Sequence, residues 1–101
     1  MKILINTCYG GFGFSEAAQQ AFLNAKGLSP DYFFNVFDED LRDDEVMINL
    51  YEAKGSEWLS KDYSRLALAE IPDGADYYIF EYDGWETLVW SDTQIHGAKF
   101  V

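Results

Sequence analysis

Residues 65–90 alternate apolar and polar or aromatic side chains with a period of two, which is the pattern of β-strands. The segment reads RLALAEI, PDGA, DYYIFEY, DG and WETLVW. An Asp-Gly pair between two such runs is typical of the two-residue turn of a β-hairpin, here at Asp83-Gly84. The pattern predicts three consecutive antiparallel strands, so the fold has to be built around an antiparallel sheet.

The first third of the chain predicts one strand followed by one helix. Residues 2–8, KILINTC, form a short apolar run typical of a strand buried on both faces, and a cluster of glycines ends it. Ser15 is a good N-cap, Glu16 suits the positive end of a helix dipole, and Gly27 supplies a C-terminal stop. We therefore expect a helix that begins after Ser15 and ends at Gly27.

The middle and the tail of the chain are less regular. Residues 31–37, DYFFNVF, fit a short strand or a packed, irregular segment. Asp43 or Asp44 can cap a second helix that ends at Gly55, and residues 56–64 fit a loop or a helical turn. The apolar face of this second helix would consist of Val46, Met47, Leu50 and Tyr51. The tail from Ser91 to Val101 could add an edge strand.

These elements follow one another in the order β-α-(β)-α-β-β-β. We expect a single small α+β domain over residues 1–101, with two helices packed on a mostly antiparallel sheet of about four strands. Eighteen percent of the residues are aromatic and 49% are hydrophobic, which is enough to build a core.

Charge is the most informative global property. Eighteen acidic residues against seven basic ones give a net charge of −11. Such a surface repels phosphate groups, so direct binding to nucleic acid or to an anionic membrane is disfavoured and a basic protein is the expected partner. No signal peptide and no apolar run of about 20 residues are recognisable, so we expect a cytoplasmic protein.

The glycine-rich loop that carries the single cysteine, residues 8–15, resembles three phosphate-binding loops and departs from each. Glu16 stands where a dinucleotide-binding loop has its third glycine, and no lysine of a Walker loop occurs between Lys2 and Lys26. Phe14 replaces the arginine that a cysteine phosphatase loop needs beside its thiolate. Either Cys8 is a small buried side chain at a tight corner, or the loop from Cys8 to Ser15 serves a small enzyme or ligand-binding domain.

Six of the eight residues in DEDLRDDE, residues 38–45, are acidic. A calcium loop starting at Asp38 would place Arg42, Asp43 and Asn49 at positions that require an oxygen ligand, glycine and glutamate. Asp43, Asp44 and Glu45 suit the start of the second helix. The remaining acids, Asp38 to Asp40, fit a loose divalent-cation site, a surface that imitates the spaced charges of DNA, or a solvated loop.

The hairpin should also display aromatic side chains. Tyr78, Phe80 and Tyr82 project from one face of the strand, and Tyr77, Ile79 and Glu81 project from the other. Only one face can pack on the helices, so some of these rings should be exposed. They would form a protein-binding patch rimmed by acids, or lie flat on the surface with their hydroxyl groups in water. His96 is isolated in sequence, and an exposed histidine is expected there.

Three separated blocks of the sequence, INTCYGGFGFS, Arg42 to Asp44 with the following helix, and IPDGADYYIFEYDG, resemble a family of small bacteriophage and prophage proteins. The family has no established activity, and Phe14 replaces the leucine typical of its first block. The resemblance implies a phage gene expressed in a bacterial cytoplasm, and small acidic phage proteins often block host defence proteins.

Together these observations predict a non-enzymatic protein that binds and inhibits a basic, nucleic-acid-binding host protein, for example as an anti-CRISPR protein. Neither a cofactor nor a metal is expected, and no oligomeric state is implied. The alternatives are an enzyme or ligand-binding domain that uses the Cys8 to Ser15 loop, and a structural or regulatory phage component whose partner completes its sheet. The expected partner-binding residues are Asp38, Glu39, Asp40, Asp43, Asp44, Tyr82, Asp83 and Trp85.

Overall fold

The computed structural model of the protein describes residues 1–91, 95–97 and 99–100. It consists of short helices and antiparallel strands, so the expected α+β class is confirmed. The elements are β1 (Lys2–Asn6), α1 (Glu16–Ala25), the 3-10 turn η1 (Glu39–Arg42), α2 (Glu45–Lys54), α3 (Ser56–Leu59), β2 (Leu66–Glu70), β3 (Asp76–Tyr82), β4 (Trp85–Ser91), β5 (Ile95–Gly97) and β6 (Lys99–Phe100).

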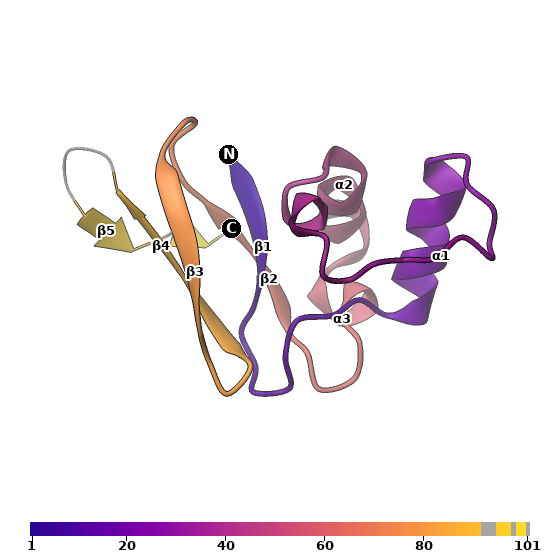
Figure 1. Cartoon of the computed structure of the whole chain (residues 1–101), viewed down its shortest axis with the longest axis horizontal. Coiled ribbons are helices and arrows are strands. Elements are labelled where there is room, and N and C mark those ends of the chain that lie inside the picture. The colour runs from indigo at the N-terminus through magenta and orange to yellow at the C-terminus, as the bar shows by residue number, and fades with distance from the viewer. Residues whose placement is uncertain (92–94, 98, 101) are drawn as a thin grey trace.

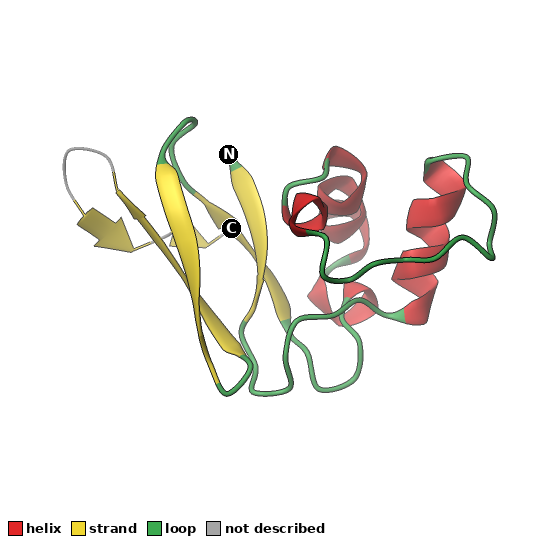
Figure 2. Ribbon diagram, in the orientation of Figure 1, coloured by secondary structure: helices red, strands yellow, loops and turns green. Residues whose placement is uncertain are grey.

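The strands form two three-stranded sheets, in the orders β1-β2-β6 and β3-β4-β5, instead of the single sheet that the sequence pattern indicated. Figure 1 shows β1 and β2 in the centre, with the helices on one side and the β3–β4 hairpin on the other. Figure 2 separates the helical half from the sheets in the same view. The protein is therefore a three-layer arrangement in which β1 and β2 are the middle layer.

Alternation along β1 explains these layers. Leu4 packs with Leu66 and Leu68 of β2 in the core beneath the helices. Ile3 and Ile5 face the opposite way and form a second core with residues of β4, among them Leu88. The run ILI is thus buried on both faces, as its unbroken apolar sequence predicted.

The first helix begins and ends where its capping residues indicated. The Ser15 hydroxyl accepts a hydrogen bond from the Ala18 N–H at 3.0 Å and donates one to the Trp58 carbonyl at 2.7 Å. Gly27 follows the helix with a φ of 71°, in the left-handed region. The hydroxyl therefore caps α1 and ties it to α3 at the same time.

The second helix is capped by Asp44, one of the two aspartates expected there. Its carboxylate accepts from the N–H groups of Val46 and Met47 and lies 2.9 Å from the Lys26 Nζ atom. Met47 is fully buried and Gly55 ends the helix with a φ of 88°. The pair with Lys26 joins the start of α2 to the end of α1.

The segment 31–37 is irregular, one of the two alternatives that its sequence left open. It lies along the helical core because Phe34 packs edge-to-face against Phe14 and Phe22, with ring centroids 5.7 and 5.6 Å apart. Residues 56–59 form the helical turn α3. In the tail, the described residues form β5 and β6, whereas 92–94, 98 and 101 of the expected edge strand lie outside the described residues.

Candidate binding cleft

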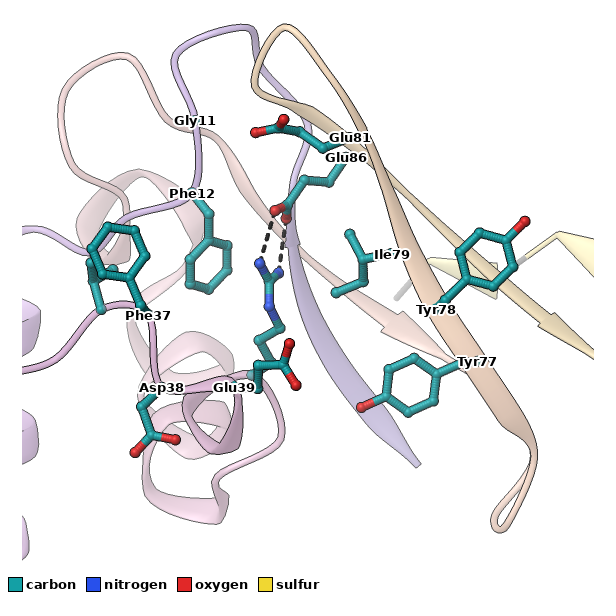
Figure 3. A pocket seen from close by; sticks show the side chains of 12 residues that line it. Gly11, Phe12, Phe37, Asp38, Glu39, Tyr77, Tyr78, Ile79, Glu81 and Glu86 are labelled. Atoms are coloured by element: carbon teal, nitrogen blue, oxygen red, sulfur yellow. Dashed lines mark hydrogen bonds and ion pairs between the residues drawn. The ribbon is translucent and has the colours of Figure 1, made fainter.

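A bidentate ion pair between Arg42 and Glu86 lies at the junction of the two halves of the molecule. Both guanidinium–carboxylate distances are 2.8 Å, and dashed lines mark these interactions at the labelled Glu86 in Figure 3. Arg42 is the last residue of η1 and Glu86 belongs to β4, so the pair joins the helical layer to the outer sheet. Glu86 is only 6% exposed, which makes this a largely desolvated pair.

The same two side chains close the free edge of β1. Arg42 donates to the Leu4 carbonyl at 3.1 Å, and Glu86 accepts from the Asn6 N–H at 2.9 Å. The guanidinium also stacks on the ring of Phe12, with 3.9 Å between its central carbon and the ring centroid. Two backbone groups of β1 that a neighbouring strand would otherwise bind, the Leu4 carbonyl and the Asn6 N–H, are thus satisfied by side chains.

Arg42 and Glu86 form part of the lining of a cleft of about 830 Å³. One wall comes from β3 and the other from η1 and the segment that precedes it, as Figure 3 shows. Carboxylates and aromatic rings line it, contributed by Phe12, Phe37, Asp38, Glu39, Tyr77, Glu81 and Glu86, whereas the ring of Tyr78 points away from it. Arg42 is the one basic side chain in this lining, and Glu86 neutralises it. The cleft is therefore aromatic and negatively charged.

The pKa of the Tyr77 phenol depends on its burial and on this negative charge. Burial raises the pKa of Tyr77 above its ordinary value of 10.0, and the nearby carboxylates of Asp43 and Glu39 raise that pKa further. Figure 3 shows the hydroxyl of Tyr77 directed toward the wall on which Glu39 lies. The ionised phenolate is disfavoured because it would enter a region that is already negative.

This shift predicts a loss of stability at alkaline pH. A pKa that is higher in the folded than in the unfolded chain stabilises the fold below the unfolded pKa, and this contribution is lost as the pH rises through the folded value. We expect the free energy of unfolding to fall above about pH 10, and to fall less steeply in Tyr77→Phe. Urea titrations of both proteins across this pH range measure the difference. Equal slopes for the two proteins would contradict it.

The acidic run, residues 38–45, is ordered, and its side chains have two different roles. Asp38 caps η1, accepting from the Asp40 N–H at 3.0 Å, while Leu41 is buried and Arg42 turns inward. Asp38, Glu39, Asp40 and Asp43 are exposed, and of these Asp38 and Glu39 line the cleft. Asp44 is instead held by its helix cap and by Lys26, so its carboxylate is already engaged within the chain.

The second group of expected site residues surrounds the hairpin turn. Asp83 and Gly84 have φ values of 51° and 88°, as the primed turn requires. Tyr82 is 70% exposed, and Trp85 is 40% exposed and packs against Tyr9 with ring centroids 5.2 Å apart. Tyr82, Asp83 and Trp85 therefore lie at the tip of the hairpin, and none of them belongs to the cleft lining.

The glycine-rich loop is filled by the protein's own backbone. A Cβ atom on Gly10 would lie 1.6 Å from the Tyr63 carbonyl oxygen, and one on Gly84 would lie 2.5 Å from the Tyr9 carbonyl oxygen. Gly11 has a φ of 91°. The loop is thus a docking point for residues around 63 and for the hairpin turn. Cys8 is half-buried, and its thiol makes no hydrogen bond in the described part of the chain.

Asn6 joins the glycine-rich loop to the hairpin turn and to the start of β2. It is fully buried, its amide donates to the carbonyls of Cys8 and Gly84 at 2.6 and 2.7 Å, and its side-chain oxygen accepts from the Arg65 N–H at 2.8 Å. Three segments that are distant in sequence therefore meet on one side chain.

Within residues 1–91, 95–97 and 99–100, no three His, Cys, Asp or Glu side chains are grouped so that they could hold a metal ion. Over the same residues, no helix has the length and apolar character needed to cross a bilayer. The side chain of His96 lies outside the described part of the structure.

The sequence patterns used above did not indicate that Arg42, Glu86 and the inner face of β3 belong to one site. A signal for them was present, because the Asp83-Gly84 turn sets Glu81 opposite Glu86. Two carboxylates in directly opposed positions repel each other, so a cation is needed nearby. Arg42 provides it.

No family model, curated protein or solved structure matches this chain in the comparisons with known proteins.

Proposed function

We propose that this protein is a non-enzymatic binding protein that docks its acidic cleft on a basic protein partner and blocks the partner's own ligand site. The observation that carries the proposal is the lining of the cleft, in which exposed aromatic rings stand beside carboxylates and the one cation is neutralised by Glu86. Such a surface suits arginine and lysine side chains, which bind carboxylates and stack on aromatic rings.

The identity of the partner follows from its required chemistry. A protein with a clustered basic surface is commonly one that binds nucleic acid, and a chain with a net charge of −11 competes with phosphates for that surface. The resemblance to phage proteins adds a host context. A bacterial defence protein, such as a CRISPR effector, is the specific form of this proposal.

The alternative function of the Cys8 to Ser15 loop has less support. The Ser15 hydroxyl is engaged by Ala18 and Trp58, and the backbone of Tyr63 lies against Gly10. These contacts fill the space in which a phosphate or substrate would have to lie. The loop is better explained as a structural corner.

The proposal is tested by capture from a nuclease-treated bacterial lysate at low and at high salt. The wild-type chain should retain a nucleic-acid-binding protein at low salt and release it at high salt. The variant Asp38→Asn/Glu39→Gln/Asp40→Asn should retain about tenfold less, because the steering charge is lost while asparagine can still cap η1.

A matched control removes the same number of charges elsewhere. Glu57→Gln/Asp62→Asn/Glu70→Gln changes exposed residues that do not line the cleft, and we expect it to capture as the wild type does. The captured protein is then assayed for nucleic-acid binding with and without the acidic protein. Equal capture by both variants, or undiminished nucleic-acid binding, would contradict the proposed function.

A further inference from the structure

In the described part of the chain, no strand pairs with the free edge of β3. In the order β3-β4-β5 its one neighbour is β4. The two-residue turn and the register direct the backbone groups of Tyr78, Phe80 and Tyr82 toward β4. The N–H and C=O groups of Tyr77, Ile79 and Glu81 consequently point away from it, and no backbone hydrogen bond among the described residues engages them.

The free edge of β3 differs from that of β1, where side chains bind two of the backbone groups. At the free edge of β1, Arg42 binds the Leu4 carbonyl and Glu86 binds the Asn6 N–H. β3 has seven residues, contains no proline and is regularly paired with β4 along its whole length. Proteins usually shield edge strands of this kind because they invite pairing with another chain.

Both faces beside this edge can receive side chains. On the outer face, Tyr78, Phe80 and Tyr82 are 61%, 57% and 70% exposed. On the inner face, Tyr77 and Glu81 line the acidic cleft together with Glu39 of the opposite wall. A strand added at the edge would direct alternate side chains into the cleft and the others beside the exposed aromatic row.

The negative charge of the cleft determines what kind of strand can bind at this edge. The side chains that enter the cleft would meet Asp38, Glu39 and Glu81, which favours arginine or lysine at every second position. A second copy of this chain is disfavoured because it would bring another net charge of −11 and the acids of its own β3 to the same edge.

We propose that a basic, extended segment of the partner protein adds to the free edge of β3 as a fourth strand, with its basic side chains in the cleft. This inference rests on the proposed function and specifies its mode of recognition. Main-chain hydrogen bonds to Tyr77, Ile79 and Glu81 would supply much of the affinity, and the carboxylates of the cleft would supply the choice of sequence.

The test uses the full chain and an Arg-Val repeat peptide of about eight residues as the probe. Binding is measured by fluorescence anisotropy, and amide hydrogen exchange is followed by NMR. We expect the amides of Tyr77, Ile79 and Glu81 to become protected when the peptide binds. A peptide with the same charge but N-methylated on alternate residues, and an Arg-Gly repeat, should bind about tenfold more weakly or worse, because neither forms a stable strand.

Protein variants locate the peptide. Glu39→Lys/Glu81→Lys should weaken binding of the Arg-Val peptide by about tenfold or more, whereas Glu57→Lys/Asp62→Lys, with the same net charge, should weaken it much less. Exchange protection of the hairpin amides in each variant without peptide shows whether the hairpin is folded.

Three results would overturn the inference. In the first, the N-methylated peptide binds as tightly as the Arg-Val peptide and the three amides are not protected. In the second, the Arg-Val peptide does not bind. In the third, the three amides become protected without peptide as the protein concentration rises. The last result would assign the edge to a second copy. Each leaves the proposed function standing if the salt-sensitive capture from lysate is observed, so the two proposals fail separately.

Discussion

Replacing Arg42 by methionine is expected to lower the free energy of unfolding by about 3–5 kcal/mol. The buried carboxylate of Glu86 would lose both of its charged hydrogen bonds, and the Leu4 carbonyl would lose its donor. Methionine keeps much of the apolar volume of the arginine side chain but not the stacking of the guanidinium on Phe12, so the loss combines the uncompensated charge with that contact. Urea unfolding followed by far-UV circular dichroism measures it.

A double-mutant cycle separates this charge effect from packing. Glu86→Gln retains an oxygen that can accept from the Asn6 N–H, and Arg42→Met/Glu86→Gln contains neither charge. We expect the double variant to be more stable than Arg42→Met alone, because the unpaired carboxylate is gone. If Arg42→Met lowers the free energy of unfolding by less than about 1 kcal/mol, the prediction is contradicted. The Arg42–Glu86 pair would then contribute no more than an exposed surface ion pair does.

Replacing Gly10 by alanine is expected to destabilise the fold by about 3 kcal/mol or more. The added Cβ atom would lie 1.6 Å from the Tyr63 carbonyl oxygen, a backbone atom that cannot move without displacing its whole loop. Gly10 is not among the glycines with positive φ, so backbone conformation contributes little. Chemical denaturation of the variant gives the loss directly.

Gly74→Ala is the matched control for this prediction. Gly74 has a φ of 80° but no atom within 4 Å of its would-be Cβ, so its replacement tests backbone strain without a clash. We expect a loss of about 1–2 kcal/mol there. A Gly10→Ala variant as stable as Gly74→Ala would show that the glycine loop and the loop around Tyr63 are not closely packed.

Much of the local structure was predictable because it depends on neighbours in sequence. The period of two in residues 65–90 and the Asp83-Gly84 turn predicted β2, β3 and β4, and Ser15 and Gly27 predicted the ends of α1. Each of these signals acts within a few residues, through a turn, a cap or the alternation of a strand. The exposure of aromatic rings on β3 was predicted in the same way.

The arrangement of the sheets was not predictable in this way. The division into two sheets depends on β1 pairing with β2, while β4 packs across β1 through Leu88 and Trp90. Alternation in β1 fixes two buried faces but does not say whether a helix or a strand covers each of them. The cleft lies between β3 and the segment around η1, which are distant in sequence, and no local pattern encodes their approach.

The same limit applies to the acidic run. Its composition indicated one charged surface, but the structure turns Leu41 and Arg42 inward and uses Asp44 as a cap. Five exposed acids of the run remain, Asp38, Glu39, Asp40, Asp43 and Glu45. The expected part of Asp38, Glu39 and Asp40 in binding stays a prediction that the variants above examine, and the part of Asp43 stays a prediction as well.

The pairing of β1 with β2 has a consequence for synthesis of the chain. Asn6 pairs with Leu66, so β1 leaves the ribosome long before the strand that covers its edge. At about 5–20 residues per second, the apolar segment Ile3–Ile5 waits several seconds for its partner. The β3–β4 hairpin, in contrast, can close within microseconds of its emergence. Among the described strand pairs, β1 is therefore the strand that stays longest without its partner during translation.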